Sequence, residues 1–315
     1  MKTLRFALVC AVAFAAVACG GSSAGIDDPL APPPGGSGTG TEDPSNDPSN
    51  DPPKDPSKDP NETDPNAGGP KIHILMKGST APFTHKDAYA GSTPKQQIVA
   101  VRSLYLLRTP NDPNPVKVFE HTHEKAVDVD VVTGKTVALA SVVAKTLPAG
   151  VYTMAKSGVS YVRYSVGARM HTAIGAIDGQ YDNVQALSDG AVIGNQVRKK
   201  GHFRYAFSAN GTTYGALEGD DAPTPVANSG GGITMDLSGP ETFYVFPVQV
   251  AIDPNITADH DALFDVNVYE SFRWQDQPSP GYQPKVFDTT PATFEPVMAF
   301  GANSFTLTSS PSAAK

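Results

Sequence analysis

The chain has 315 residues, a formal net charge of −8, 29 glycines, 29 prolines and only two cysteines. This length allows one large or two small domains, and the low cysteine content argues against a disulfide-rich fold. After residue 70 the acidic and basic residues nearly balance, so the basic footprint of a nucleic-acid-binding protein is missing and no nucleic-acid partner is expected.

The first 18 residues have the layout of a secretory signal peptide. Lys2 and Arg5 form a short basic segment, and an almost unbroken apolar run follows over residues 6–17. This run is too short for a membrane-spanning helix, which needs about 20 apolar residues. It fits the apolar core of a signal peptide, and a small-residue cleavage site follows it.

The segment Ala16-Val17-Ala18-Cys19-Gly20 resembles the lipobox of bacterial lipoproteins, although that family prefers Leu where this chain has Ala16. The resemblance implies cleavage after Ala18 and lipidation of Cys19 with three acyl chains. Stable membrane anchoring needs only about two such signals, so three chains would anchor the protein firmly. Gly20, in place of an Asp, implies export to the outer membrane. The alternative is ordinary secretion with a free thiol at Cys19, which is a liability in an oxidising compartment.

Residues 19–70 are predicted to be a lipidated N-terminus followed by a disordered linker. Residues 20–70 carry ten acidic groups, two lysines and no aromatic residue, and Asp-Pro tetrads fill residues 43–62. Proline removes backbone donors and holds the preceding residue extended, and no repeat has an apolar residue to bury. We expect an extended acidic spacer. Calcium binding by these repeats is the alternative, which the spread of carboxylates along an extended chain disfavours.

Residues 71–315 are predicted to form an all-β domain, an antiparallel β-sandwich, with two sub-domains divided near residues 170–200 as an alternative. Short alternating or β-branched runs separated by Gly, Pro, Asn and Asp are typical of strands joined by turns. Only residues 140–147 suit a helical turn. The strand-like runs cover residues 71–76, 98–107, 127–132, 151–154, 161–166, 202–207, 233–237, 243–246 and 263–269.

Three of these segments carry a second resemblance: residues 98–107, the Val-Asp-Val-Asp run from Val127, and Leu147-Pro-Ala-Gly-Val-Tyr-Thr153. Together they resemble uncharacterised bacterial lipoproteins with a transthyretin-like (prealbumin-like) β-sandwich, over about residues 71–170. The resemblance implies a sandwich and supplies no catalytic residue. The last segment also has a local cause, because Pro148 and Gly150 favour a turn and Tyr152 begins a packed strand.

His121 and His123 are the first candidate metal ligands. Residues two apart face the same side of a strand, so both imidazoles are expected to reach one zinc ion there. Glu124 joins them as a third ligand only if the segment is a loop. The alternative interpretation is a pair of solvated loop histidines.

An oxygen-rich run is the second candidate metal site, with calcium as the ion. It comprises Asp253, Asn255, Asp259 and Asp261, with Thr257, His260 and Asp265 nearby. It is not an EF-hand, because Ala258 stands where Gly is needed and Phe264 where Glu is needed. The alternative is a turn at Asp253-Pro254-Asn255 followed by a solvated loop.

Two further motifs concern Trp274 and Ser141. Trp274, the only tryptophan, is a candidate for a sugar-stacking platform with Tyr282, Phe272 and Phe287. Burial in the sandwich core is favoured over this platform, because tryptophan is large and usually mostly buried. Ser141-Val-Val-Ala-Lys145 resembles the Ser-x-x-Lys motif of acyl-enzyme families but has one residue too many between Ser and Lys, and its companion motifs stand in the wrong order for that chemistry.

The sequence therefore favours a membrane-anchored, non-enzymatic envelope module for binding, adhesion or structure, without a cofactor and with an unknown protein or glycan partner. Two alternatives remain open because the fold class does not decide function. One is a calcium- or zinc-assisted hydrolase that uses His121, His123 and the acids of residues 253–265. The other is a carbohydrate-binding module.

Overall fold

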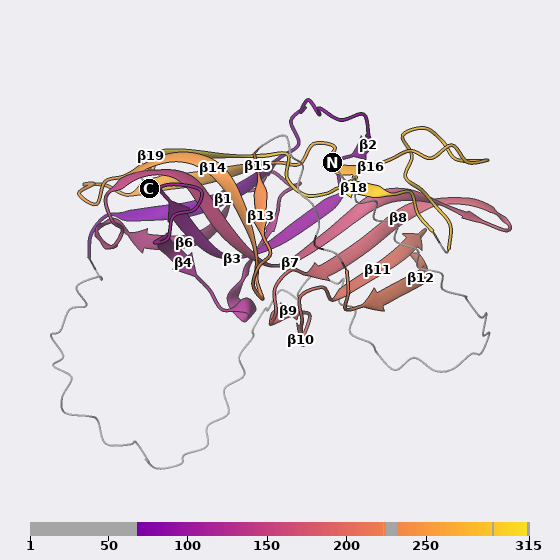
Figure 1. Cartoon of the computed structure of the whole chain (residues 1–315), viewed down its shortest axis with the longest axis horizontal. Helices are drawn as coiled ribbons and strands as arrows, with labels where there is room; N and C mark the ends of the chain where they lie inside the picture. The colour runs from indigo at the N-terminus through magenta and orange to yellow at the C-terminus, as the bar shows by residue number, and fades with distance from the viewer. Residues whose placement is uncertain (1–67, 223, 225–231, 292, 314–315) are drawn as a thin grey trace, which may run out of the picture.

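The computed structural model of the chain describes residues 68–222, 224, 232–291 and 293–313 (Figure 1). Cys19 and the linker up to residue 67 lie outside the described residues, so the predictions made for them stay predictions. Every regular element of the described part is a strand, except the 3-10 helices η1 His123–Lys125 and η2 Ala144–Thr146. The predicted all-β class is confirmed. None of the described helices is long and apolar enough to span a bilayer.

Every predicted run overlaps a strand, but the structure also has strands that were not predicted. In chain order the strands are β1 Lys71–Ser79, β2 Ala90–Ser92, β3 Gln96–Leu107, β4 Val116–Glu120, β5 Val127–Asp130, β6 Val137–Val143, β7 Gly150–Thr172, β8 Gly175–Ala186, β9 Ala191–Ile193, β10 Gln196–Arg198, β11 Phe203–Ala209, β12 Thr212–Gly219, β13 Thr234–Asp236, β14 Thr242–Ile252, β15 His260–Asn267, β16 Phe272–Trp274, β17 Asp288–Thr289, β18 Val297–Ala299 and β19 Ser304–Pro311. Among the strands that were not predicted are the 12-residue β8 and the eight-residue β12 and β19. The expected helical turn is confined to η2.

Strand β7 joins the two halves of the molecule. Along its first part it pairs with β3 on one side and β14 on the other, and along residues 161–172 it pairs with β8. Its 23 residues contain no proline, so no backbone donor is missing from the ladder. A Cβ at Gly158 would lie 2.4 Å from Ser103 Oγ and 3.1 Å from the Phe243 ring, so any other residue there would have to displace both side chains.

A second sheet has the order β19-β15-β1-β6. Strands β1 and β15 pair in parallel, as do β17 and β7, so the purely antiparallel prediction is wrong at these two places. The alternation of apolar and polar residues shows which face of the sheet a side chain occupies, but it does not show whether neighbouring strands run parallel or antiparallel. Parallel neighbours need a long connection, and these partners lie far apart along the chain.

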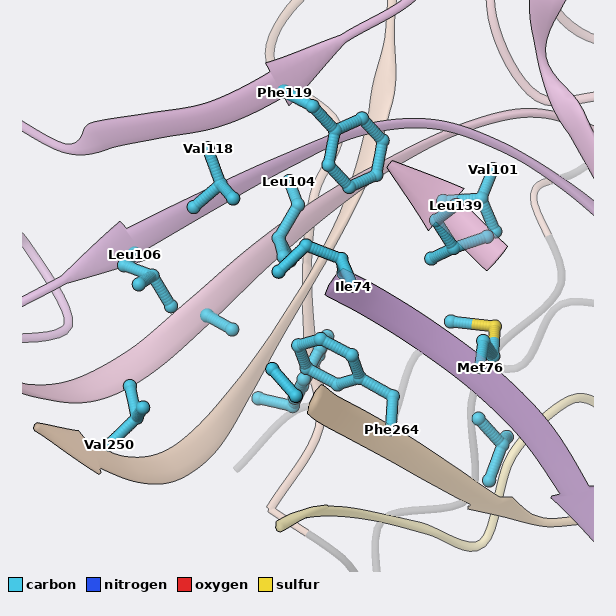
Figure 2. Packing of buried hydrophobic residues seen from close by; sticks show 14 of the residues in the cluster. Ile74, Met76, Val101, Leu104, Leu106, Val118, Phe119, Leu139, Val250 and Phe264 are labelled. Atoms are coloured by element: carbon cyan, nitrogen blue, oxygen red, sulfur yellow. The ribbon is translucent and has the colours of Figure 1, made fainter. Parts of the chain in front are cut away.

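The main core lies between this second sheet and the first half of the β7 sheet (Figure 2). Alternate residues of β1, namely Ile72, Ile74 and Met76, are buried. Phe264 of β15 is 2% exposed, and Figure 2 shows it beside Ile74 and below Leu104 of β3. The period-two alternation of β1 thus places one face on the core and the other toward solvent.

Two smaller clusters cover the second half of β7. On one face, the sheet β18-β16-β2 and its flanking loops bring Phe272, Trp274, Phe287 and Phe300 against Val166, Ala168 and Met170 of β7. On the other face, Ala191 and Ile193 of β9 pack on Tyr161 and Val184. The β9–β10 hairpin therefore lies on the outside of the long sheet.

We expect Phe264→Ala to lower the free energy of unfolding by about 3–5 kcal/mol, because it leaves a cavity between the sheets. Urea unfolding of the full chain measures this loss. Ile174→Ala is the control, since Ile174 is 95% exposed at the β7–β8 turn and a surface change there should stay within about 0.5 kcal/mol. Equal losses for the two variants would contradict the assignment of Phe264 to the core.

Candidate functional site

The two predicted zinc ligands point to different elements. His121 Nε2 lies 2.9 Å from the carbonyl oxygen of Leu139 on β6, and His123 Nδ1 lies 2.9 Å from Ser160 Oγ on β7. Burial lowers the pKa of His123, and the nearby Arg102 lowers it further. In the described part of the chain, no group of three or more His, Cys, Asp or Glu side chains is arranged to hold a metal. The predicted histidine centre is therefore not assembled there.

The acids of the predicted calcium run are also engaged separately. Asp253 Oδ1 accepts a hydrogen bond from the Asn255 N–H at 2.8 Å, which is the turn given as the alternative. Asp261 Oδ1 accepts from Ser312 Oγ at 2.6 Å, and Asp259 Oδ1 accepts from the Lys71 N–H at 2.8 Å. Asp259 and Asp261 therefore tie the ends of neighbouring strands together, and these acids do not converge on a cation.

Asp259 also takes part in a Ser–His–Asp line on the outer face of the second sheet. His73 Nδ1 lies 2.8 Å from Ser141 Oγ, and His73 Nε2 lies 3.4 Å from Asp259 Oδ2. The three residue types are those of a catalytic triad, in which a buried acid orients the imidazole. Here the Asp259 side chain is 47% exposed, so water competes for the carboxylate. The line therefore fits a role in joining β6, β1 and β15 better than catalysis.

A pH-dependent contribution to stability follows from Asp259. The backbone bond from Lys71, followed by His73, lowers its pKa below the ordinary 3.8. Since the folded-state pKa is the lower one, the stabilisation is full above the unfolded-state pKa and is lost as the pH falls through the folded-state pKa. We expect wild type to be more stable than Asp259→Asn above about pH 5, and the gap to close toward about pH 2. Urea unfolding across this range measures it, and a gap that persists at the lowest pH would contradict the assignment.

Trp274 lies in the core, as the favoured interpretation expects, and the candidate sugar platform is not formed. Its side chain is 1% exposed, and its ring packs 5.8 Å from Phe272 and 5.6 Å from Phe287. The indole Nε1 donates to Asp276 Oδ1 at 2.9 Å. All three residues of β16 are buried, so no face of the indole is free for a sugar. Tyr282 instead stacks on His171, with ring centroids 4.8 Å apart.

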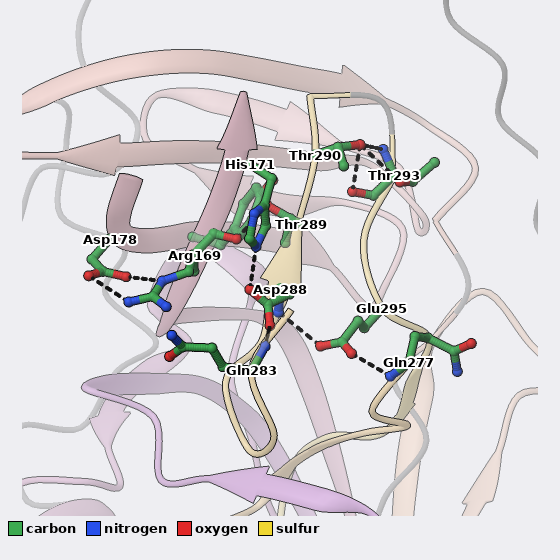
Figure 3. Close-up of polar contacts among 11 residues, drawn as sticks. Arg169, His171, Asp178, Gln277, Gln283, Asp288, Thr289, Thr290, Thr293 and Glu295 are labelled. Carbon is green, nitrogen blue, oxygen red and sulfur yellow. Dashed lines mark hydrogen bonds and ion pairs between the residues drawn. The ribbon is translucent and has the colours of Figure 1, made fainter. Parts of the chain in front are cut away.

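The best-built polar group of the described residues lies beside that stack, and sequence reasoning missed it. We call it the acid centre: Asp288, Glu295 and His171 (Figure 3). Asp288 is fully buried, and β17 places it next to β7 by parallel pairing. Its Oδ1 accepts a hydrogen bond from His171 Nε2 at 2.6 Å, and its Oδ2 accepts one from the Gln283 N–H at 2.7 Å.

Glu295 supplies the second carboxylate of the acid centre. It is 2% exposed and accepts hydrogen bonds from the N–H groups of Gln277 at 2.6 Å and Asp288 at 2.9 Å. Burial raises its pKa, and the charges of Asp276 and Asp288 add to the rise. The two carboxylates thus satisfy backbone donors of the loop 275–296 and fix its path over the second half of β7.

The chemistry open to the acid centre depends on the second nitrogen of His171. A buried carboxylate that orients an imidazole is the arrangement of a general base. A Cβ at Gly281, however, would lie 3.5 Å from His171 Nδ1, so the loop passes directly over that nitrogen. With Tyr282 stacked on the ring as well, the loop covers two sides of His171 and leaves 20% of its side chain exposed. We therefore interpret the acid centre as a clamp that holds the loop 275–296.

This clamp predicts the effect of Asp288→Asn. The amide cannot accept from both His171 and Gln283 as the carboxylate does, so a buried donor loses its partner at a cost of about 1–3 kcal/mol. Hydrogen exchange should show faster exchange of the Gln283 and Asp288 amides. Asp178→Asn is the control, because Asp178 pairs with Arg169 on the same half of β7 but is 74% exposed. Similar exchange in the two variants would contradict a clamping role.

Comparison with known proteins adds no assignment. Neither a protein family, nor a curated protein, nor a solved structure matches the chain. Functional inference therefore depends on the sequence and on the geometry described above.

Proposed function

We propose that this chain is a lipid-anchored cell-envelope protein that holds a β-sandwich module away from the membrane on an acidic spacer. The module acts by binding or adhesion, or as a structural element, and is not an enzyme. The lipobox-like Cys19 segment supports the anchoring, with Gly20 favouring the outer membrane. Two face-to-face sheets that share one core cluster support the sandwich.

Two small cavities in the core support a surface contact over an enclosed substrate site at those places. They lie among described core side chains such as Phe264 and Tyr244 and measure about 20 and 50 Å³. Pockets for small-molecule ligands are commonly about 300–1,000 Å³. A surface contact is therefore favoured over an enclosed substrate site.

The observation that carries the binding proposal is the loop 275–296 with the strand that follows it. The acid centre fixes the loop from below, while Phe294, Val297 and Met298 are 45%, 42% and 37% exposed. Large apolar side chains presented on a rigid base suit partner recognition, because little conformational entropy is lost on binding. We call these three residues the apolar ridge.

The anchoring is tested by metabolic labelling with an alkyne analogue of palmitate. We expect wild type to be labelled and to fractionate with membranes, and Cys19→Ala to lose both properties. Cys10→Ala is the matched control, because Cys10 lies in the segment expected to be removed, and it should behave as wild type. Labelling that persists in Cys19→Ala, or that is absent from wild type, would refute the lipid anchor.

The binding role is tested with a photo-crosslinking amino acid placed in cells at Phe294 or at Val151. Val151 is 58% exposed on the other half of the molecule and serves as the control. We expect discrete crosslinked products from position 294 that are absent from position 151. Identical patterns at both positions, or no product at position 294, would count against the apolar ridge as a binding surface.

A further inference from the structure

The segment from Arg198 to Arg204 concentrates positive charge in a chain that is acidic as a whole. It reads Arg-Lys-Lys-Gly-His-Phe-Arg, with four Lys or Arg and one His in seven residues. Strand β10 ends at Arg198, and β11 begins at Phe203. The segment therefore crosses from the outer hairpin to the long sheet and brings its cations to that corner.

The acids around this segment leave one arginine without a partner. Glu218 of β12 lies opposite Arg204 in the strand register. Its Oε1 lies 3.4 Å from Arg198 Nη2 and 3.5 Å from His202 Nε2 instead. Asp220 pairs with His202 Nδ1 at 2.7 Å. Asp189 lies at the other end of the segment, where it accepts from the Lys200 N–H. Among the residues that the structure describes, no carboxylate lies within ion-pair distance of Arg204, so this cation has no ion pair of its own.

Buried donors give a second, independent observation. Arg204 Nη1 and Arg198 Nε are shielded from solvent and have no hydrogen-bond partner within the described residues. A buried guanidinium donor without an acceptor costs free energy, and such a donor often marks an ion or water that completes the site. Two such donors lie on neighbouring arginines that flank the same glutamate.

The surroundings hold these arginines in place. Val184 of β8 is the register neighbour of Arg204 and is 1% exposed beneath the hairpin residues Ala191 and Ile193. Arg163 of β7 is the register neighbour of Val184 on its other side, and it adds positive charge to the same face. The cations are thus presented by packed strands and are pre-organised for a ligand.

We propose that Arg198 and Arg204 form a binding site for a phosphate group, with the exposed Lys199 at its rim. The planar guanidinium groups offer paired donors that match the oxygens of a phosphate, and charge-assisted bonds of this kind are the strong ones. Phosphate competes with Glu218 for Arg198 and gives the half-buried Arg204 side chain an anionic partner. The phosphate belongs either to a free small molecule or to a lipid headgroup, and the experiment distinguishes these sources.

The experiment uses the full chain with Cys19→Ser, so that no attached lipid can tether it to vesicles. Titration calorimetry with inorganic phosphate tests the free anion. Co-sedimentation with phosphatidylglycerol vesicles, against phosphatidylcholine vesicles, tests the headgroup. We expect saturable binding in at least one arm, weakened about tenfold or more by Arg204→Ala because the paired charge-assisted bonds are lost. Arg204→Lys should recover part of the affinity.

Two further variants separate the site from a general effect on folding. Glu218→Gln removes the competing carboxylate and should tighten binding severalfold, a change that misfolding would not produce. Arg169→Ala is the matched control, because Arg169 already pairs with Asp178 at 2.6 Å, and it should bind as the parent does. Absence of binding in both arms, or binding that neither Arg204→Ala nor Glu218→Gln changes, overturns the proposal.

Discussion

The ladder of hydrogen bonds along β7 is the constraint on which the rest of the structure depends. One continuous strand pairs with β3 and β14 in one half and with β8 in the other. The main core and the aromatic cluster around Trp274 therefore share a single backbone element. A break in β7 would remove the longest strand that connects the two hydrophobic clusters.

Local pattern predicted the strands with strong alternation or β-branched runs, but it missed polar or glycine-containing strands such as β8 and β12 and did not predict which strands pair. The alternation of β1 and β15 reports their buried faces correctly, and the turn at Asp253 follows from its own sequence. The parallel pairing of β1 with β15 joins segments 188 residues apart, as the Lys71–Asp259 bond shows, and no local signal encodes such a contact. The partners of His121 and His123 could not be predicted for the same reason, since the two side chains contact Leu139 of β6 and Ser160 of β7.

The acid centre shows why the best-built polar group was not predictable. Asp288 and His171 are 117 residues apart, and neither stands in a recognisable motif. The sequence analysis considered only reactive residues that lie close together in the chain. The fold instead buries two acids with no such neighbours, and backbone N–H groups of one loop donate hydrogen bonds to them. Trp274 is the opposite case, because the general preference of tryptophan for burial predicts its place in the core beneath that loop without any knowledge of its partners.

Counting donors and acceptors separates structural polar groups from candidate binding groups in this molecule. His73, Asp259, Asp288 and Glu295 each have partners within the fold, so their chemistry is used in joining strands and loops. Arg204 differs, because its neighbouring glutamate is drawn toward Arg198 and His202 and a buried donor is left over. An external acceptor gains more binding free energy at an unsatisfied donor than at a satisfied one. For this reason we propose the ligand site at the basic segment and not at the histidines.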